Sequence, residues 1–150
     1  NVSFKILLSE ISDSFMQISD KRINMNFNEY KKDIFFKRSP EITYGIRNFF
    51  GNAVKYSKSE INISLIADDK KLKIIITDNG PGFPKDILEN IGQPYIVSNS
   101  AVLNEKRGLG LGTFIGKTLL ERSRASLKFS NLKKGGAKVD ISWNISDITT

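Results

Sequence analysis

The chain reads Asn48-Phe49-Phe50-Gly51-Asn52-Ala53-Val54-Lys55-Tyr56 in the middle of a predicted helix. Its two asparagines are four residues apart, so their carboxamides project from one face of that helix. Lys55 follows Asn52 by three residues and adds an ammonium group to this face. Such a face can hold a hydrated cation and the phosphates that accompany it. Alternatively, both asparagines are solvated helix residues that bind nothing.

Two further elements follow in the chain. The first, Asp78-Asn79-Gly80-Pro81-Gly82-Phe83, begins where an apolar strand ends, so it places a carboxylate at the rim of a sheet beside backbone that a ligand can approach closely. Its alternative interpretation is a turn in which the aspartate caps a loop. The second, Arg107-Gly108-Leu109-Gly110-Leu111-Gly112-Thr113, leads into a helical pattern that starts at Leu111, and a helix N-terminus favours phosphate. This glycine run fits neither the P-loop nor the dinucleotide pattern, but the order of all three elements favours a nucleotide site.

Composition limits the chemistry of the chain. Its 150 residues are 39% hydrophobic and 10% aromatic, which predicts one folded domain over residues 1–150. With no cysteine, it can form neither a disulfide nor a thiolate metal site. With no histidine, it lacks the usual general base and cannot itself carry a phosphohistidine. No apolar run approaches the roughly 20 residues that span a bilayer, so we expect a soluble chain.

The net charge of +7 comes from 23 basic and 16 acidic residues, a balance that suits nucleic acid, anionic lipid or a polyphosphate ligand. The basic residues are scattered, and no aromatic-interleaved basic stripe is present. We therefore interpret most of them as solvated surface and expect no nucleic-acid partner.

Hydrophobic periodicity predicts alternating helices and strands. A stripe of apolar residues predicts a first helix over residues 4–18, and Ser39 with Pro40 marks the start of the helix that ends near Ser57. The predicted strands form three hairpins, at residues 23–27 with 34–36, 60–67 with 71–78, and 125–131 with 137–145. A short helix is predicted at 84–91, followed by a loop without periodicity up to the glycine run.

These motifs resemble the ATP-binding catalytic domain of sensor histidine kinases, within the GHKL ATPase family that includes gyrase and Hsp90. The resemblance covers residues 40 to 140 most clearly. In family order, the N box, first glycine box, F box and second glycine box correspond to Asn48–Tyr56, Asp78–Phe83, Gln93-Pro94-Tyr95 and Gly108–Thr113. More narrowly, the segments 91–95 and 117–123 resemble the redox-responsive RegB/PrrB group of sensor kinases.

The resemblance implies an α+β fold, a two-layer α/β sandwich with a mixed sheet and helices on one face, known as the Bergerat or GHKL fold. It implies ATP and Mg²⁺ as ligands, with Asp78 selecting adenine and Asn52 binding the metal. The residues that it assigns to catalysis are Asn48, Lys55, Lys106 and Arg107. The residues that it assigns to nucleotide binding are Asn48, Asn52, Lys55, Tyr56, Asp78, Gly80, Gly82, Tyr95, Lys106, Arg107, Gly108, Gly110, Gly112 and Thr113.

The implied activity is that of a protein histidine kinase in two-component signal transduction, which transfers the γ-phosphoryl group of ATP to a histidine on a separate dimerisation helix. That phosphoacceptor helix and, indirectly, a response regulator are the implied partners. We expect the sensor and phosphoacceptor domains to lie elsewhere in a longer parent, so that this is the cytoplasmic domain of a protein anchored in the bacterial inner membrane. The alternatives are a GHKL serine kinase of the anti-sigma-factor type and an interaction module with a degenerate nucleotide site.

Three positions depart from the family pattern. Thr113 replaces a leucine that is usual in the second glycine box. Tyr44 replaces a histidine or an acid one turn before Asn48, which disfavours an activity that needs a base there. Ser98 follows the F box where a basic residue is common.

Overall fold

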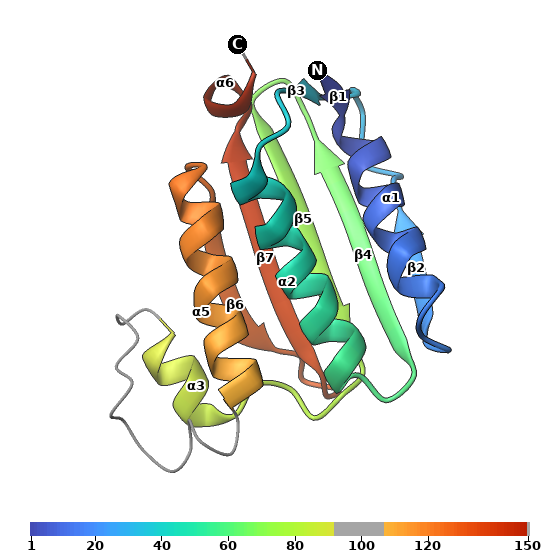
Figure 1. Cartoon of the computed structure of the whole chain (residues 1–150), viewed down its shortest axis with the longest axis vertical. Helices are drawn as coiled ribbons and strands as arrows, with labels where there is room; N and C mark the ends of the chain where they lie inside the picture. Colours follow the sequence, from blue (N-terminus) through green and yellow to red (C-terminus); the bar gives the residue numbers. More distant parts are fainter. Residues whose placement is uncertain (92–106, 150) are drawn as a thin grey trace.

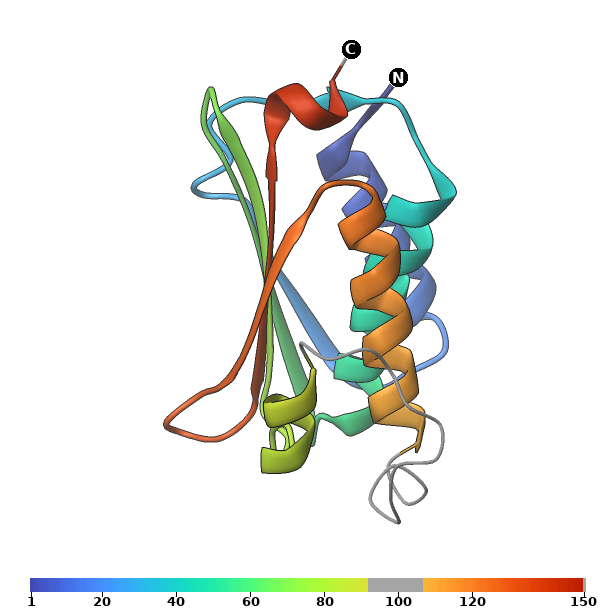
Figure 2. The same cartoon turned by 90° about the vertical axis from the view of Figure 1, so that its left-hand side faces the viewer.

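The chain forms two layers, a sheet and a set of helices (Figure 1). The computed structural model describes residues 1–91 and 107–149, with the backbone alone for residues 107–111. Five strands form the main sheet in the order β2-β4-β5-β7-β6, and their bounds are Arg22–Asn26, Glu60–Ala67, Lys71–Asp78, Ala137–Asn144 and Ser126–Asn131 respectively. Three helices cover one face of this sheet, α1 (Phe4–Met16), α2 (Pro40–Tyr56) and α5 (Arg107–Arg122) (Figure 2). The predicted mixed sheet with helices on one face is confirmed.

The central strands have the bounds that the sequence predicted. β4 and β5 pair antiparallel, as do β6 and β7, which confirms these two hairpins. Alternation in β4 and β5 turns one apolar row toward the helices, where these side chains are at most 2% exposed: Ile61, Ile63, Leu65, Leu72, Ile74 and Ile76. Trp143 of β7 is 1% exposed and packs edge-on against Phe4, with 5.3 Å between ring centroids.

The first predicted hairpin is wrong. β2 pairs parallel with β4, while the Phe35–Phe36 strand (β3) pairs with Val2–Ser3 (β1) in a separate two-stranded sheet. The reason is burial: Phe36 is fully buried, and its ring lies 4.7 Å from that of Phe4 in α1. Between β2 and β3, the Tyr30 hydroxyl donates to Asp33 and accepts from the backbone N–H of Ile34. Burial and the bond to Asp33 raise the pKa of Tyr30 above its usual range, so the phenol remains a donor.

Smaller differences concern the ends of elements. α1 ends at Met16, and Ile18, which the apolar stripe had included, is 79% exposed. The predicted short helix is confirmed as α3 (Lys85–Asn90), and a final turn of helix, α6 (Ile145–Ile148), was not predicted. Over the ranges that the structure describes, no helix combines the length and apolar character that crossing a membrane requires.

Helix α2 lies between α1 and α5 in the helix layer and carries one side of the pocket described below (Figure 1). Its buried face consists of Ile42, Gly45, Ile46, Phe49, Phe50 and Ala53. A Cβ on Gly45 would lie 2.5 Å from Cγ of Leu120, and a Cβ on Gly116 would lie 2.9 Å from the Phe49 ring. These two glycines therefore let α2 and α5 approach more closely than side chains would allow.

Ser39 caps α2, as the sequence predicted. Its Oγ accepts the backbone N–H of Ile42 at 3.2 Å. We expect Ser39→Ala to lower the free energy of unfolding by about 1 kcal/mol, because the amide loses its acceptor. Urea denaturation measures this loss, and Ser39→Asp, which restores a capping oxygen, serves as the control. Equal losses in both variants would contradict the capping role.

Candidate functional site

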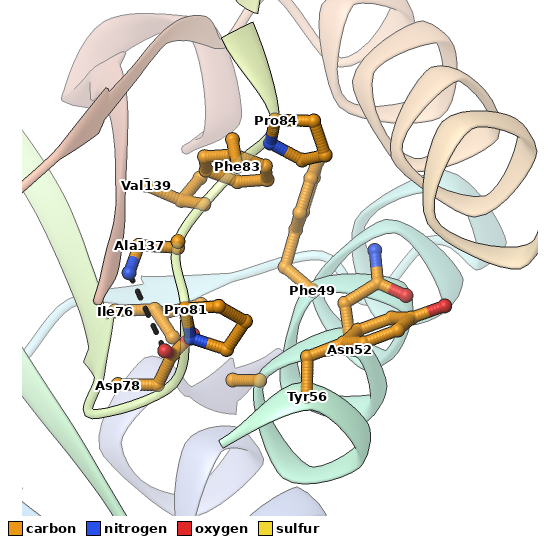
Figure 3. Close-up of a pocket in the computed structure, with 12 residues that line it drawn as sticks. Phe49, Asn52, Tyr56, Ile76, Asp78, Pro81, Phe83, Pro84, Ala137 and Val139 are labelled. Carbon is orange, nitrogen blue, oxygen red and sulfur yellow. Dashed lines mark hydrogen bonds between the residues drawn. The ribbon is translucent and has the colours of Figure 1, made fainter. Parts of the chain in front are cut away.

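A pocket of about 170 Å³ lies between the two layers, at the end of the sheet where β5 stops (Figure 3). An apolar cavity of about 150 Å³ is enough to hold an aromatic ring. The wall is mostly apolar, and its polar groups belong mainly to Asn52, Tyr56 and Asp78. The residues that line the pocket are Phe49, Asn52, Ala53, Tyr56, Ile76, Asp78, Pro81, Gly82, Phe83, Pro84, Ala137 and Val139.

Asp78 is the one carboxylate in this wall. It is the last residue of β5 and is 9% exposed, so its predicted place at the rim of the sheet is confirmed. Its Oδ1 accepts the backbone N–H of Gly80 at 2.8 Å. The same oxygen accepts the backbone N–H of Ala137 at 3.3 Å (Figure 3). Two amides thus fix one oxygen of the carboxylate. Within the described part of the chain the other oxygen has no hydrogen-bond partner, so it can accept a hydrogen bond from a planar ligand in the pocket.

Close backbone contacts at Gly80 hold the end of β5 against the end of α2, next to the pocket-lining residues Asp78 and Tyr56. A Cβ on Gly80 would lie 2.2 Å from the carbonyl oxygen of Tyr56, so no other residue fits there without displacing the end of α2. Next to it, the Asn79 Oδ1 accepts three successive backbone N–H groups, those of residues 58, 59 and 60, at 3.0, 3.0 and 3.1 Å. Lys21 donates to carbonyls at the end of α2, including that of Ser57 at 2.7 Å. These contacts position the Tyr56 side chain against the pocket.

The opposite wall is fixed by the last hairpin. Asn131 at the end of β6 binds both backbone groups of Phe83, accepting its N–H at 2.7 Å and donating to its carbonyl at 2.9 Å. Gly82 adopts a positive φ of 85°, and a Cβ there would lie 2.7 Å from the Asn131 Oδ1. Gly136, with φ of 110°, lies so close to Asp78 that a Cβ would overlap its carbonyl oxygen. The last hairpin therefore contacts both Phe83 and Asp78 and fixes their positions.

A second group of polar residues lies where α2 meets α5. Asn48 and Asn52 face Gly112: a Cβ on Gly112 would lie 3.4 Å from Oδ1 of Asn52 and 4.0 Å from Oδ1 of Asn48. Asn48 Nδ2 donates to the carbonyl of Tyr44 at 2.8 Å, and Asn52 Nδ2 donates to Oγ1 of Thr113 at 3.2 Å. With both amide nitrogens engaged, the two carboxamide oxygens are left as acceptors, and oxygen ligands of this kind suit Mg²⁺.

The structure describes the remaining predicted site residues only in part. Lys55 is exposed, and its Nζ lies 5.2 Å from the centroid of the Tyr56 ring. Tyr95 and Lys106, together with the rest of the predicted loop up to residue 106, lie outside the described residues. Arg107, Gly108 and Gly110 lie in the first turn of α5, where only the backbone is described.

The predicted start of the helix at Leu111 is wrong, since α5 begins at Arg107. The N–H groups of the first three helical residues have no acceptor within the helix, so the Gly108 amide still lies where a phosphate could bind. Gly110 and Gly112 lie further along the helix. Gly112 lies beside the two asparagines, where even an added Cβ would make only ordinary contacts.

Sequence patterns missed several residues that shape the pocket. Phe49, Phe83 and Val139 line it as ordinary core residues, and periodicity does not distinguish such residues from the rest of a core. Asn131 gave no signal, because a single asparagine before a turn is unremarkable. The pair Gly135-Gly136 lies in the turn of the last predicted hairpin. The second glycine could have indicated that another backbone segment approaches closely there.

A mixed sheet with helices on one face and a pocket between the layers is the architecture of GHKL-type ATPase domains. A family model of "Histidine kinase-, DNA gyrase B-, and HSP90-like ATPase" matches residues 38–146. The chain belongs to this family.

Curated relatives of the chain are sensor kinases. It is 36% identical to the sensor histidine kinase RegB of Cereibacter sphaeroides over 124 residues, which are 72% of this chain and 27% of RegB. It is 29% identical to the sensor histidine kinase CpxA of Escherichia coli K12 over 96 residues, or 64% of this chain and 21% of CpxA. The predicted resemblance to the RegB group is confirmed, and the chain spans only about a quarter of these proteins.

Solved structures share the fold. The mycobacterial sensor histidine kinase MprB superposes with a TM-score of 0.71 at 17% identity, covering 95% of each chain. A nucleotide-free catalytic domain of the histidine kinase ThkA gives 0.73 at 15% identity, covering 95% of this chain and 94% of ThkA. Full-length ShkA in complex with AMPPNP gives 0.72 at 19% identity, covering 94% of this chain and 30% of ShkA.

Proposed function

We propose that this chain is the catalytic domain of a sensor histidine kinase, which binds ATP and Mg²⁺ and donates the γ-phosphoryl group to a histidine on a separate dimerisation helix. The observation that carries the proposal is that Asp78 and Asn52 line opposite sides of one apolar pocket, with Asn48 one turn before Asn52 on α2 (Figure 3). A carboxylate at one end suits a base with an exocyclic amino group. Carboxamide oxygens and free amides at the other end suit a metal-bound polyphosphate.

Adenine would lie in the apolar part of the pocket, between the α2 side chains Phe49 and Tyr56 and the segment from Pro81 to Pro84. The free oxygen of Asp78 would accept a hydrogen bond from the adenine amino group. A guanine would present its carbonyl oxygen at the same point, and two acceptors would face each other. The carboxylate therefore favours adenine over guanine.

The phosphates would extend toward the junction of α2 and α5. Asn52 would ligate Mg²⁺ there, with Asn48 beside it, and phosphates and waters would complete the octahedral shell. When bound, the metal ion neutralises charge that develops on the phosphoryl oxygens. Lys55, Lys106 and Arg107 would contribute positive charge, and the amides at the start of α5, including that of Gly108, would hold phosphate oxygens. Tyr95 would help to hold the segment before α5 closed over the nucleotide.

In the reaction, the bond from the γ-phosphorus to the bridging oxygen breaks, a bond to an imidazole nitrogen forms, and ADP leaves. Catalysis then depends mainly on positioning and on charge neutralisation. The chain itself contains no histidine, so the acceptor belongs to another segment or another polypeptide. The parent would be anchored in the bacterial inner membrane with this domain in the cytoplasm, and it would pass the phosphoryl group to a response regulator.

Asn52→Ala tests the metal-binding role. We expect wild-type chain to bind AMPPNP about tenfold more tightly with Mg²⁺ than with EDTA, and this gain to vanish in Asn52→Ala, because a ligand oxygen is lost. Calorimetric titration measures both affinities. Asn24→Ala, on a strand remote from the pocket, is the matched control and should keep the gain. A full gain in Asn52→Ala would contradict the assignment.

Phosphoryl transfer is tested by adding the dimerisation domain of the parent to the chain with γ-labelled ATP. Label that is lost in acid and stable in base indicates phosphohistidine and supports the proposal. Acid-stable label on a partner's serine would instead favour the anti-sigma-factor type of kinase. A wild-type chain that binds no AMPPNP at millimolar concentration would favour the degenerate interaction module.

A further inference from the structure

One side-chain contact joins α2 to α5 beside the pocket. Asn52 Nδ2 donates to Oγ1 of Thr113 at 3.2 Å, across a separation of 61 residues in the sequence. Thr113 is 1% exposed, so its hydroxyl has almost no surface with which to touch a nucleotide itself. Any effect of Thr113 on the ligand must therefore pass through Asn52.

A carboxamide has two ends of nearly equal shape and opposite chemistry. Only its oxygen can ligate a cation, while its nitrogen carries two donor hydrogens that a cation repels. Rotation by 180° about the last side-chain bond exchanges the two ends. When the oxygen ligates a metal ion, the nitrogen faces away from the ion and needs a neighbour that accepts its hydrogen.

Thr113 can be that neighbour. Its Oγ1 accepts the Nδ2–H of Asn52, which turns Oδ1 to the other side of the amide. Gly112, the preceding residue, leaves space for this arrangement, because even an added Cβ would lie 3.4 Å from Oδ1 and 3.7 Å from Nδ2. The hydroxyl comes from α5, so the orientation of the amide also depends on where α5 lies.

We propose that Thr113 is a positioning residue, whose hydroxyl holds the Asn52 carboxamide with its oxygen directed at Mg²⁺. The inference rests on the proposed function, in which Asn52 ligates the metal ion. It differs from the role expected from sequence, where Thr113 was grouped with residues that bind the nucleotide directly. Partners that orient a metal ligand in this way are typically worth about 10- to 100-fold in metal affinity.

The test compares Thr113→Val, which keeps the shape and removes the hydroxyl, with Thr113→Ser, which keeps the hydroxyl. Thr43→Val is the matched control, since the Thr43 hydroxyl is buried and makes no hydrogen bond within the described part of the chain. AMPPNP affinity is measured by calorimetry in Mg²⁺ and in EDTA. We expect Thr113→Val to reduce the Mg²⁺-dependent gain about tenfold and to leave the EDTA affinity within about twofold of wild type. Thr113→Ser and Thr43→Val should keep the gain.

A second measurement needs no ligand. In ¹⁵N-labelled protein, the Asn52 side-chain NH₂ resonance, assigned by its disappearance in Asn52→Ala, should shift in Thr113→Val and stay near its wild-type position in Thr113→Ser. The remaining resonances report whether each variant is folded.

The outcomes separate the two proposals. If wild type binds AMPPNP with a Mg²⁺-dependent gain and Thr113→Val retains that gain, the positioning role of Thr113 is overturned while the proposed function stands. Equal loss of affinity in Mg²⁺ and in EDTA would indicate a merely structural role and would also overturn it. If wild type shows no binding or no gain, the proposed function fails, and the role of Thr113 fails with it.

Discussion

Asp78→Asn is expected to weaken AMPPNP binding about 100-fold, or ~3 kcal/mol. In the wild type, two backbone amides bind Oδ1, and the second carboxylate oxygen stays free for the adenine amino group. An asparagine has one acceptor oxygen and one donor nitrogen. Its nitrogen must therefore face either the two backbone N–H groups or the adenine amino group, and donors oppose each other in both cases. Titration calorimetry in the presence of Mg²⁺ measures the loss.

Asp140→Asn provides the matched control for this prediction. Asp140 lies on β7, forms long ion pairs with Lys73 and Lys138, and does not line the pocket. The same change of chemistry there should leave the affinity within about twofold of wild type, because Asp140 does not line the pocket. Similar losses in both variants would show a general effect of charge and would refute the specific role of Asp78.

Gly136→Ala is expected to lower the free energy of unfolding by about 4 kcal/mol. Two costs combine at this position. The backbone has a φ of 110°, which a residue with a side chain rarely adopts, and the added Cβ would lie 1.8 Å from the carbonyl oxygen of Asp78. Either β5 or the hairpin must move to relieve this overlap. Urea denaturation measures the loss, and AMPPNP affinity should fall as well, because Asp78 is displaced.

The neighbouring glycine separates the two costs. Gly135 has a φ of 101°, and a Cβ there would meet no atom within 4 Å. Gly135→Ala should therefore carry only the conformational cost, about 2 kcal/mol, and leave nucleotide binding unchanged. If the two alanine variants lost equal stability, the contact between Gly136 and Asp78 would have no measurable energetic weight.

Local patterns predicted those parts of the fold whose partners are near in sequence. The predicted bounds of β4 and β5 agree with the structure residue for residue. Alternating apolar residues and a turn at Asp68 are enough to define an antiparallel pair. The start of α2 matched because a cap and a proline mark it locally. Asp78 was found for the same reason, since it ends a clearly apolar strand.

Features that depend on distant partners were not predictable in this way. β2 was given the wrong partner because two short apolar segments close in sequence resemble a hairpin, whereas the burial of Phe36 against Phe4 decides where β3 lies. The start of α5 was placed too late because glycines suggest a loop. Further along the same helix, Gly116 packs closely against Phe49 of α2, a tertiary contact that leaves no signal in the local pattern.

The residues of the site divide in the same way, into those with a local sequence pattern and those that depend on distant contacts. Asn52 and Asp78 belong to motifs with their own local pattern, and both line the pocket. Asn131 and Gly136 act only because the last hairpin reaches the pocket, and their roles follow from tertiary contacts with Phe83 and Asp78.

The glycine contacts between α2 and α5 also bear on local unfolding. Gly45 and Gly116 leave no room for either helix to shift unless the other shifts too. Packed elements often open as one cooperative unit, so we expect the amides in the middle of both helices to share one opening free energy. A nucleotide that contacts either the helix with the asparagines or the helix that begins with the glycine run should then protect both from hydrogen exchange.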